Sequence, residues 1–433
     1  MRGFEKPSIK TEIPGPESRM LSQRLKAVEC QNVTYLAEDY PIFLNKSDAT
    51  NVWDVDGNRY VDLTSFFGVS FIGHNHPLIR RCLGEPDLVN GLGDVLPSVS
   101  KVELLEEINR LLGGGYVGIL GQNGSDAVES AIKTAYLYTG KPGIIAFKGA
   151  YHGLSLGALM ATYNPKFKDP FRAYLPDNTI YFVFPTSLEE SDAVGREIED
   201  HLRSRNDVGL VILELIQARG GVKIVPKDFV KRLAELSKEY DVVLAFDEIY
   251  TGCGRCGRLF LYEYYGVQPD VIILGKALSS SFPLSVMMAK EHIMKAWPKS
   301  GGEAIHTSTF LGHPLMSKVA LEVLRYIEKE KLWKVAEKSG EYLMKKLLNL
   351  REKHPDCVKD VRGMGLLVGI ELNGISAFEL SKELLKMGYI VLPSGLNGEV
   401  LEITPPVIVS KEIIDDFIQV LSRVLEQWTS IQK

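Results

Sequence analysis

The sequence predicts an α/β protein whose larger part is a mostly parallel sheet packed between helices. From about residue 98, short apolar runs alternate with segments in which apolar residues recur at helical spacing. The apolar runs lack the polar alternation of half-exposed strands, which indicates strands that are buried on both faces. Near residue 313 the pattern of apolar residues changes to long helical segments followed by short strands, which predicts a second, smaller α+β unit.

The elements of the larger part follow from these patterns in order. Strands are expected at 117–120, 143–147, 180–184, 210–215, 242–246 and 271–274. Helices are expected at 101–112, 125–138, 188–204 and 226–240.

The smaller part has its own signals at both ends of the chain. Residues 51–60 flank an Asp-Gly pair with alternating side chains, which favours a β-hairpin. After residue 313, helices are expected at 313–330, 332–353, 376–387 and from 411, and strands at 366–372 and around 389–403.

Composition excludes several classes of protein. The 433 residues exceed the ~250–300 at which a single core stops growing, so more than one domain is expected. With 50 Lys and Arg against 55 Asp and Glu, the net charge of −5 supplies no basic surface for nucleic acid or an anionic membrane. No apolar run approaches the ~18 residues that cross a bilayer, and the first twenty residues lack a secretory signal. Five scattered cysteines suit a reducing compartment, so we expect a cytoplasmic protein.

Four polar groups follow expected strands, and each allows two interpretations. Gly124 and Ser125 begin an expected helix, where free N–H groups and the helix dipole can bind a phosphate or where a cap simply satisfies the helix end. Tyr151 can stack on a planar ring or be an ordinary core tyrosine. Asp247 can pair with a ring nitrogen or cap a turn. Lys276 can form a Schiff base or be a solvated side chain.

Two further motifs are weaker. Residues 252–257 match Gly-x-Gly-x-x-Gly after a strand, but neither a helix nor a correctly spaced acidic residue follows, so the dinucleotide fingerprint fails. Cys253 and Cys256 within it are expected to be free thiols, because no second pair completes a zinc site; a redox pair is the alternative. His74 and His76 lack a nearby ligand cluster, so no metal site is predicted.

Taken together, the four strand-end groups specify one ligand. A phosphate cradle, an aromatic stacker, an acid for a ring nitrogen and a Schiff-base lysine are the parts that pyridoxal 5'-phosphate requires. The groups also occur in a sensible order, each at the end of a successive strand. We therefore predict a pyridoxal-phosphate site.

At this point the chain resembles the class III aminotransferases of the fold-type-I pyridoxal-phosphate enzymes, from about residue 30 to 430. The stretches that carry the resemblance are 52–63, 73–77, 124–129, 151–153, 214–217, 247–252, 269–271, 275–276 and 306–310, and the Gly-Cys-Gly-Arg-Cys-Gly loop stands where the family has Gly-Phe-Gly-Arg-Thr-Gly. The resemblance implies a seven-stranded, mostly parallel sheet in a large domain at 61–315. It also implies a small domain built from 1–60 and 316–433.

The resemblance assigns roles by position. Gly124 and Ser125 would hold the phosphate, Tyr151 and Ile249 would cover the two faces of the ring, and Asp247 would pair with its nitrogen. Lys276 would carry the Schiff base, and His152 belongs to the cofactor set. Thr309 would reach the phosphate of a neighbouring subunit, which implies an obligate homodimer. Family members often have Gln where Tyr250 stands, next to the cofactor's phenolic oxygen.

The substrate side departs from the family pattern. Members that act on amino acids often carry Arg where this chain has Leu154 and Glu402, so two carboxylate clamps are missing. The alternative is that Glu402 only pairs with a cation near the rim while another Arg substitutes. Glu214 is a third candidate on the substrate side. We interpret the departures as favouring an amine, ω-amino compound or basic donor over an acidic α-amino acid.

The predicted reaction is transfer of an amino group from an amine or amino acid to a keto acid or aldehyde, with Lys276 and Asp247 as catalytic residues. An amino-acid racemase or epimerase on the same scaffold is the nearest alternative, since the sequence does not separate the two. A nicotinamide-dependent oxidoreductase rests only on the failed fingerprint, and a non-catalytic scaffold is a further alternative. The visible spectrum of the bound cofactor and its loss in Lys276→Ala would separate these.

Overall fold

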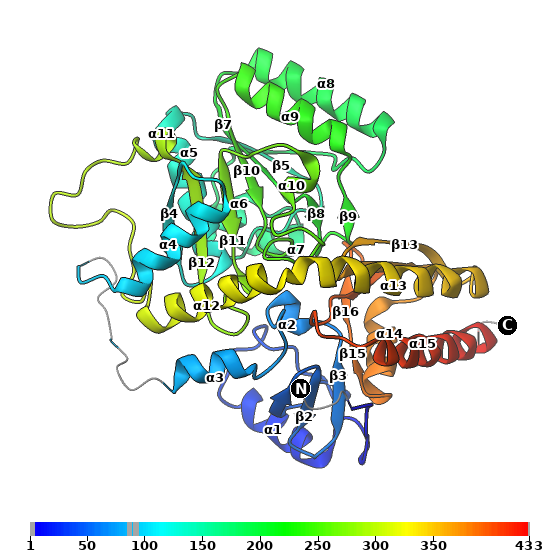
Figure 1. Cartoon of the computed structure of the whole chain (residues 1–433). Helices are drawn as coiled ribbons and strands as arrows, with labels where there is room; N and C mark the ends of the chain where they lie inside the picture. Colours follow the sequence, from blue (N-terminus) through cyan, green and yellow to red (C-terminus); the bar gives the residue numbers. More distant parts are fainter. Residues whose placement is uncertain (1–4, 85–88, 90–94, 432–433) are drawn as a thin grey trace. The chain divides into compact units, whose positions relative to one another are not determined.

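The computed structural model describes residues 5–84, 89 and 95–431, which form two compact units (Figure 1). The central unit comprises Leu78–Lys334, and the terminal unit comprises Met1–Pro77 together with Val335–Lys433. The terminal unit, like the small domain expected from the sequence, draws on both ends of the chain. The boundaries at 60/61 and 315/316 stay a prediction.

The central unit is built on a seven-stranded sheet in the order β4-β12-β11-β10-β7-β5-β6. Its strands are β4 Tyr116–Gly121, β5 Gly143–Phe147, β6 Thr179–Phe182, β7 Val208–Leu213, β10 Val243–Asp247, β11 Val271–Leu274 and β12 Ser285–Lys290. β12 runs antiparallel to both of its neighbours, whereas β5, β6, β7, β10 and β11 pair in parallel. The mostly parallel, seven-stranded sheet expected from the resemblance is confirmed.

Helices surround this sheet (Figure 1). Their bounds are α3 Pro77–Leu83, α4 Val99–Leu111, α5 Gly124–Thr139, α6 Leu156–Ala161, α7 Pro165–Lys168, η1 Asp169–Tyr174, α8 Leu188–Ser204, α9 Lys227–Glu239, α10 Tyr262–Tyr265, η2 Lys276–Leu278, α11 Glu291–Met294 and α12 Pro314–Glu330. A short hairpin, β8 Ile216–Gln217 with β9 Lys223–Ile224, leaves the carboxyl end of β7.

The core of the central unit explains why the strands read as continuous apolar runs. Every residue of β5, β7, β10 and β11 is buried, as expected for strands that are covered on both faces. Small side chains of α5, including Ala127, Ala131 and Ala135, pack in one cluster with Ile212 and Ile273 of the sheet. These alanines bring the helix close to the strands, so the start of α5 is held at the carboxyl edge of the sheet.

The terminal unit contains two four-stranded sheets, in the orders β1-β2-β3-β15 and β13-β14-β17-β16. Its elements are α1 Pro16–Lys26, β1 Leu44–Asp48, β2 Asn51–Asp54, β3 Arg59–Asp62, α2 Ser65–Gly68, α13 Leu332–Lys353, β13 Val358–Met364, β14 Leu367–Leu372, α14 Ala377–Lys386, β15 Tyr389–Ile390, β16 Leu392–Ser394, β17 Val400–Ile403 and α15 Lys411–Ile431. The parallel pairing of β15 with β3 joins the two ends of the chain within one sheet.

The secondary structure agrees closely with the expectations from sequence. The helices expected at 188–204 and 332–353 have those bounds, and β5 is the strand expected at 143–147. β7 ends at Leu213, two residues earlier than expected, so Glu214 follows the strand instead of lying within it. Across the described residues, every helix is too short or too polar to span a bilayer.

Candidate active site

The carboxyl ends of the parallel strands meet at one edge of the central sheet, where ligands bind in open α/β sheets. Each polar group singled out from the sequence follows one of these ends. Gly124 and Ser125 follow β4, Tyr151 and His152 follow β5, Glu214 follows β7, Asp247 closes β10, and Lys276 follows β11. The antiparallel strand β12 begins at the same edge, since Ser285 pairs with Gly121 and its hydroxyl donates to the Asn123 carbonyl at 2.6 Å.

The start of α5 carries both a cap and a free anion-binding end. Asn123 accepts from the Asp126 N–H at 3.1 Å, and the Asp126 carboxylate accepts from the Gln122 N–H at 2.9 Å. This reciprocal cap leaves the N–H groups of Gly124 and Ser125, at the first helical positions, without acceptors inside the helix. Together with the positive end of the helix dipole they can bind a phosphate. The cap therefore does not exclude a phosphate site, although the sequence presented the two as alternatives.

Two glycines bring neighbouring segments against this helix start. A Cβ on Gly124 would lie 2.9 Å from Cδ1 of Ile249, and a Cβ on Gly153 would lie 2.1 Å from Oγ of Ser125. Gly153 also has a φ of +122°, and the next N–H, of Leu154, donates to the Ser125 hydroxyl at 3.3 Å. Backbone therefore lies where side chains would otherwise block access to the helix end, and this forms a cradle of the shape that a bound phosphate needs.

Asp247 and His152 form a buried pair at the end of β10. Nδ1 of His152 lies 2.7 Å from Oδ2 of Asp247, and the other carboxylate oxygen accepts from the Ile249 N–H at 3.0 Å. The two side chains belong to residues that are 2% and 5% exposed. Burial by itself lowers the pKa of His152, but the hydrogen bond and charge of Asp247, with Glu214, raise it overall. This arrangement orients a carboxylate that can hold a proton on a heteroaromatic nitrogen.

Glu248, the acid next to Asp247, stabilises a loop. Glu248 is fully buried, and its two oxygens accept from the N–H groups of Leu261 at 2.6 Å and Tyr262 at 2.7 Å. It therefore fixes the loop that follows β10 and is not part of the cofactor set. Of the two neighbouring acids, Glu248 is engaged with loop N–H groups, and Asp247 stays the predicted partner of the ring nitrogen.

Lys276 begins a short 3-10 turn immediately after β11, in a left-handed backbone conformation with φ of +46°. Such a conformation is uncommon for a residue with a side chain and is found at functional sites. Its Nζ lies 3.5 Å from the centre of the Tyr250 ring. The preceding Gly275 approaches Ile249, since a Cβ there would lie 3.3 Å from that side chain. Ile249 thus contacts both the cradle glycine and the residue before Lys276.

Tyr151 is tied to Glu214, because its N–H donates to the Glu214 carboxylate at 2.9 Å. Burial raises the pKa of Glu214 to about 7, and the positive charge of His152 opposes this rise. Lys276 also interacts electrostatically with Glu214. Glu214 is therefore a titratable group within the predicted site, as a strongly perturbed carboxyl in an active site often is.

Arg219 lies beside the candidate site and was not singled out from the sequence. Its guanidinium lies 5.2 Å from the centre of the Tyr151 ring. Arg219 stands in the turn between β8 and β9, where Gly220 packs so closely that a Cβ would lie 2.9 Å from the Gly149 carbonyl oxygen. That close approach sets the turn beside the Tyr151 segment. Arg219 stands in a Gly-rich stretch after Gln217. That stretch has neither helical nor strand periodicity, so no sequence pattern pointed to the residue.

The structure places the remaining candidate residues in different surroundings. Leu154 is 47% exposed and next to the cradle. Thr309 is exposed in the segment before α12. Glu402 belongs to the terminal unit, in β17, where it pairs with Gly369 of β14 and is 2% exposed. Cys253 and Cys256 are buried free thiols, and burial raises the pKa of both.

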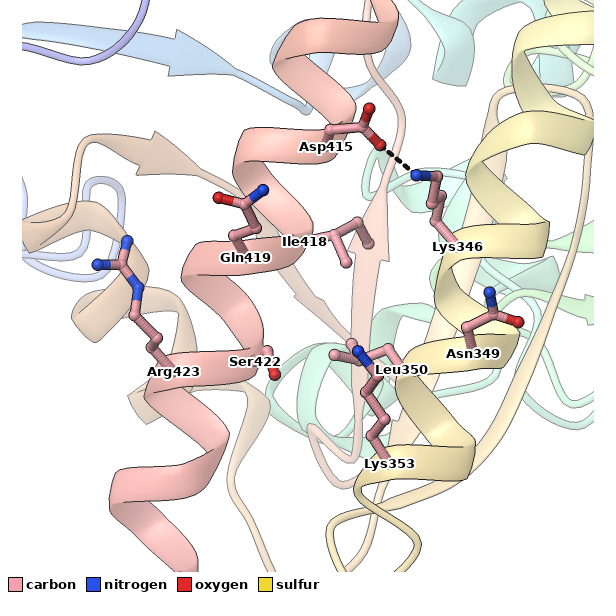
Figure 2. A pocket seen from close by; sticks show the side chains of 9 residues that line it. All are labelled: Lys346, Asn349, Leu350, Lys353, Asp415, Ile418, Gln419, Ser422 and Arg423. Carbon is pink, nitrogen blue, oxygen red and sulfur yellow. Dashed lines mark ion pairs between the residues drawn. The ribbon is translucent and has the colours of Figure 1, made fainter.

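A cavity of about 660 Å³ lies in the terminal unit between α13 and α15 (Figure 2). It is lined by Lys346, Asn349, Leu350, Lys353, Asp415, Ile418, Gln419, Ser422 and Arg423. Lys346 and Asp415 are paired at 2.7 Å. None of the residues predicted to bind the cofactor lines this cavity, so it is separate from the candidate active site.

Comparison with known proteins gives the family. The model of the class III aminotransferases matches residues 34–425. An acetylornithine aminotransferase of Caldanaerobacter subterraneus is 34% identical over 90% of this chain and 95% of that protein. An alanine/serine racemase of Pyrococcus horikoshii is 30% identical over 98% and 93%. Among solved structures, an omega-transaminase of Thermomicrobium roseum is 26% identical with a TM-score of 0.85, over 94% of this chain and 98% of that one.

The cofactor of the class III aminotransferases suits the described edge of the sheet. The cradle at the start of α5 would accept a phosphate, and Asp247 and Lys276 provide the acid and the amine that pyridoxal 5'-phosphate requires. The match to the family spans nearly the whole chain. The chain belongs to the class III aminotransferases, which are pyridoxal-phosphate-dependent enzymes.

Proposed function

We propose that the chain transfers the amino group of an ω-amino acid, in which the reacting amine is remote from the carboxylate, to a keto acid or aldehyde. The observation that carries the proposal is the pair of cations at the site, Lys276 at the end of β11 and Arg219 beside Tyr151. One would react with the cofactor and the other would bind the donor's carboxylate. The omega-transaminase among the solved structures agrees with a donor of this kind.

Each described group has a task toward the cofactor, which supplies an electron sink when bound. The N–H groups of Gly124 and Ser125 bind the phosphate. Asp247, oriented by His152, holds a proton on the ring nitrogen. Tyr151 and Ile249 cover the faces of the ring and exclude water.

Lys276 has two tasks. Its Nζ would hold the cofactor, and an incoming donor amine would have to take its place. When it is not bonded, Nζ could act first as a base that takes a proton from the carbon bearing the donor's amine and then as an acid that gives the proton up. The half-buried position of Nζ over Tyr250 keeps it at the edge where this transfer occurs.

The substrate proposal depends on three positions. Leu154 and Glu402 stand where family members that act on amino acids often carry Arg, so those clamps cannot bind a carboxylate here. Arg219 offers a planar guanidinium at a different place, beside Tyr151. Glu214 carries a second recognition group next to Lys276, and in its ionised form it would favour a cationic donor. A donor with its carboxylate far from its amine fits this change of position.

The test compares donors that differ only in the carboxylate. Removing a charged hydrogen-bonding partner costs about 1.5–3 kcal/mol, so Arg219→Gln should raise KM for ω-amino acids about 10- to 150-fold. KM for simple amines without a carboxylate should stay unchanged, and Arg219→Lys should restore only part of the loss. Exclusive use of glutamate and aspartate as donors would overturn the substrate proposal.

We also propose a homodimer in which Thr309 contacts the phosphate site of the neighbouring subunit. The exposed position of Thr309 in the single chain supports this role. Sedimentation of the wild type and weaker cofactor binding in Thr309→Ala would test it. A cytoplasmic location likewise remains a proposal, supported by the five free thiols.

A racemase is the second candidate function, because the alanine/serine racemase relative is similar along nearly the whole chain. In that reaction the proton returns to the carbon from which it came, so no acceptor is consumed. Incubation of L-alanine without a keto acid, and of an ω-amino acid with one, distinguishes the two functions. Formation of D-alanine would select the racemase, whereas consumption of an acceptor in step with the donor selects the aminotransferase.

A further inference from the structure

Tyr250 contacts Lys276 through the face of its ring. The residue is 7% exposed, and the centre of its ring lies 3.5 Å from Nζ of Lys276. An ammonium group at this distance from an aromatic face is attracted by the negative charge of the ring's π system. The face of the ring, as distinct from the hydroxyl, is therefore the part of Tyr250 that acts on the lysine.

The ring is held in this place by its neighbours. The Asp247 carboxylate accepts from the Ile249 N–H at 3.0 Å, and the Glu248 N–H donates to the Ile273 carbonyl at 2.9 Å. The Gly252 N–H donates to the Glu248 carbonyl at 2.9 Å. These bonds fix the backbone on both sides of Tyr250. The pairing of β10 with β11 thus places Tyr250 and the start of the Lys276 turn on neighbouring strand ends, from which the lysine side chain reaches the ring.

Lys276 is constrained from its own side as well. Its left-handed φ of +46° and the close approach of Gly275 to Ile249 set the direction in which the side chain leaves the backbone. Glu214 adds a negative charge that interacts with the same ammonium. The lysine is therefore placed between an aromatic face and a carboxyl, and both favour its charged form.

We propose that the ring of Tyr250 is a positioning surface that stabilises the ammonium form of Lys276, the form that arises when the lysine has taken the donor's proton. This inference rests on the role proposed for Lys276. The charged lysine would remain over the site as the acid that delivers the proton, and it would be kept from bonding again too early. Substitution of the ring by an aliphatic side chain would increase the fraction of neutral amine.

The experiment measures that fraction in the full-length protein freed of cofactor. Lys276 is labelled with a small acylating reagent, which reacts only with neutral amines, and the extent is read by peptide mass spectrometry. The ratio of the labelling rate at pH 7 to the rate at high pH reports the neutral fraction, because a change in access affects both rates equally. In Tyr250→Leu this ratio should rise about 2- to 30-fold, the range that corresponds to a cation–π contact.

Tyr250→Phe is the matched control, because it keeps the ring and removes only the hydroxyl. The ratio of labelling rates in Tyr250→Phe should stay within about twofold of the wild-type ratio. Labelling of the exposed Lys166 should be the same in all variants and shows that the reagent acts equally on each of them. If Tyr250→Leu does not fold, Tyr250→Gln carries the same expectation. An unchanged ratio in the variants without the ring, or a raised ratio in Tyr250→Phe, would overturn the inference.

The labelling needs neither cofactor nor substrate, so it is independent of activity. A protein whose labelling changes as expected but that transfers no amino group would refute the proposed function and leave the Tyr250 contact standing. A protein that transfers amino groups while its labelling is unchanged would refute the inference alone.

Discussion

Gly153 gives the sharpest prediction about the phosphate cradle. Its φ of +122° is a conformation that side chains rarely adopt, and a Cβ would lie only 2.1 Å from Oγ of Ser125. In Gly153→Ala the strained backbone costs about 1–3 kcal/mol of unfolding free energy. The clash must in addition move Ser125 or the following N–H of Leu154, because real carbon–oxygen contacts are never so short. The variant should therefore lose both stability and the geometry of the cradle.

In Gly153→Ala the displacement of Ser125 should also weaken the binding of pyridoxal 5'-phosphate. A phosphate that loses one charge-assisted hydrogen bond binds more weakly by about 1.5–3 kcal/mol, or roughly 10- to 150-fold. Gly140→Ala is the matched control, since Gly140 ends the same helix with φ of +69° and has no atom within 4 Å of the added Cβ. It should cost about 1–2 kcal/mol of stability and leave the affinity unchanged.

The measurements are urea unfolding for stability and titration with pyridoxal 5'-phosphate for affinity. Both variants should unfold at lower urea concentration than the wild type, and only Gly153→Ala should bind the cofactor more weakly. Wild-type affinity in Gly153→Ala would refute the assignment of Ser125 to the phosphate, even if the variant were less stable.

Two further predictions concern titratable groups of the site. Because burial raises the pKa of Glu214 to about 7, the folded chain binds this proton more tightly than the unfolded chain, so the free energy of unfolding should fall by about 3 kcal/mol between pH 4.5 and 7. Glu214→Gln, whose amide oxygen can still accept from the Tyr151 N–H, should reduce this slope in urea titrations at several pH values; an equal slope would contradict the assignment. Asp247→Asn removes the charge that raises the pKa of His152, so burial then opposes protonation of the imidazole. The variant should lose about 3–5 kcal/mol of unfolding free energy below pH 6.5 and less above it, whereas a loss that does not change with pH would count against the pair.

The strand-end groups were predictable because buried parallel strands have a strong local signal and their carboxyl ends must meet at one edge. Asp247 and Lys276 each follow such a strand, so their order along the chain already indicated that they converge. The start of α5 was less certain, since the same residues could cap a helix or bind an anion. The structure shows that Asn123 and Asp126 form the cap and leave Gly124 and Ser125 available.

Other features depend on contacts that no local pattern encodes. The antiparallel direction of β12 results from the short connection after Lys276, and its residues look like those of any buried strand. Arg219 comes beside Tyr151 only because β8 pairs with β9 and Gly220 approaches Gly149. The contact of Tyr250 with Lys276 likewise requires β10 and β11 to be neighbours. Long-range pairing therefore determines the substrate side of the site more than the cofactor side.

The central claim is that Lys276 is the residue that bonds to pyridoxal 5'-phosphate. Borohydride reduction of the loaded protein fixes the cofactor onto the lysine that holds it, and mass spectrometry of the peptides identifies that lysine. The cofactor's mass should be found on the peptide that contains Lys276, and Lys276→Ala should carry none and transfer no amino group from an ω-amino acid. Label on another lysine of the wild type, or amino transfer by Lys276→Ala, would contradict the claim.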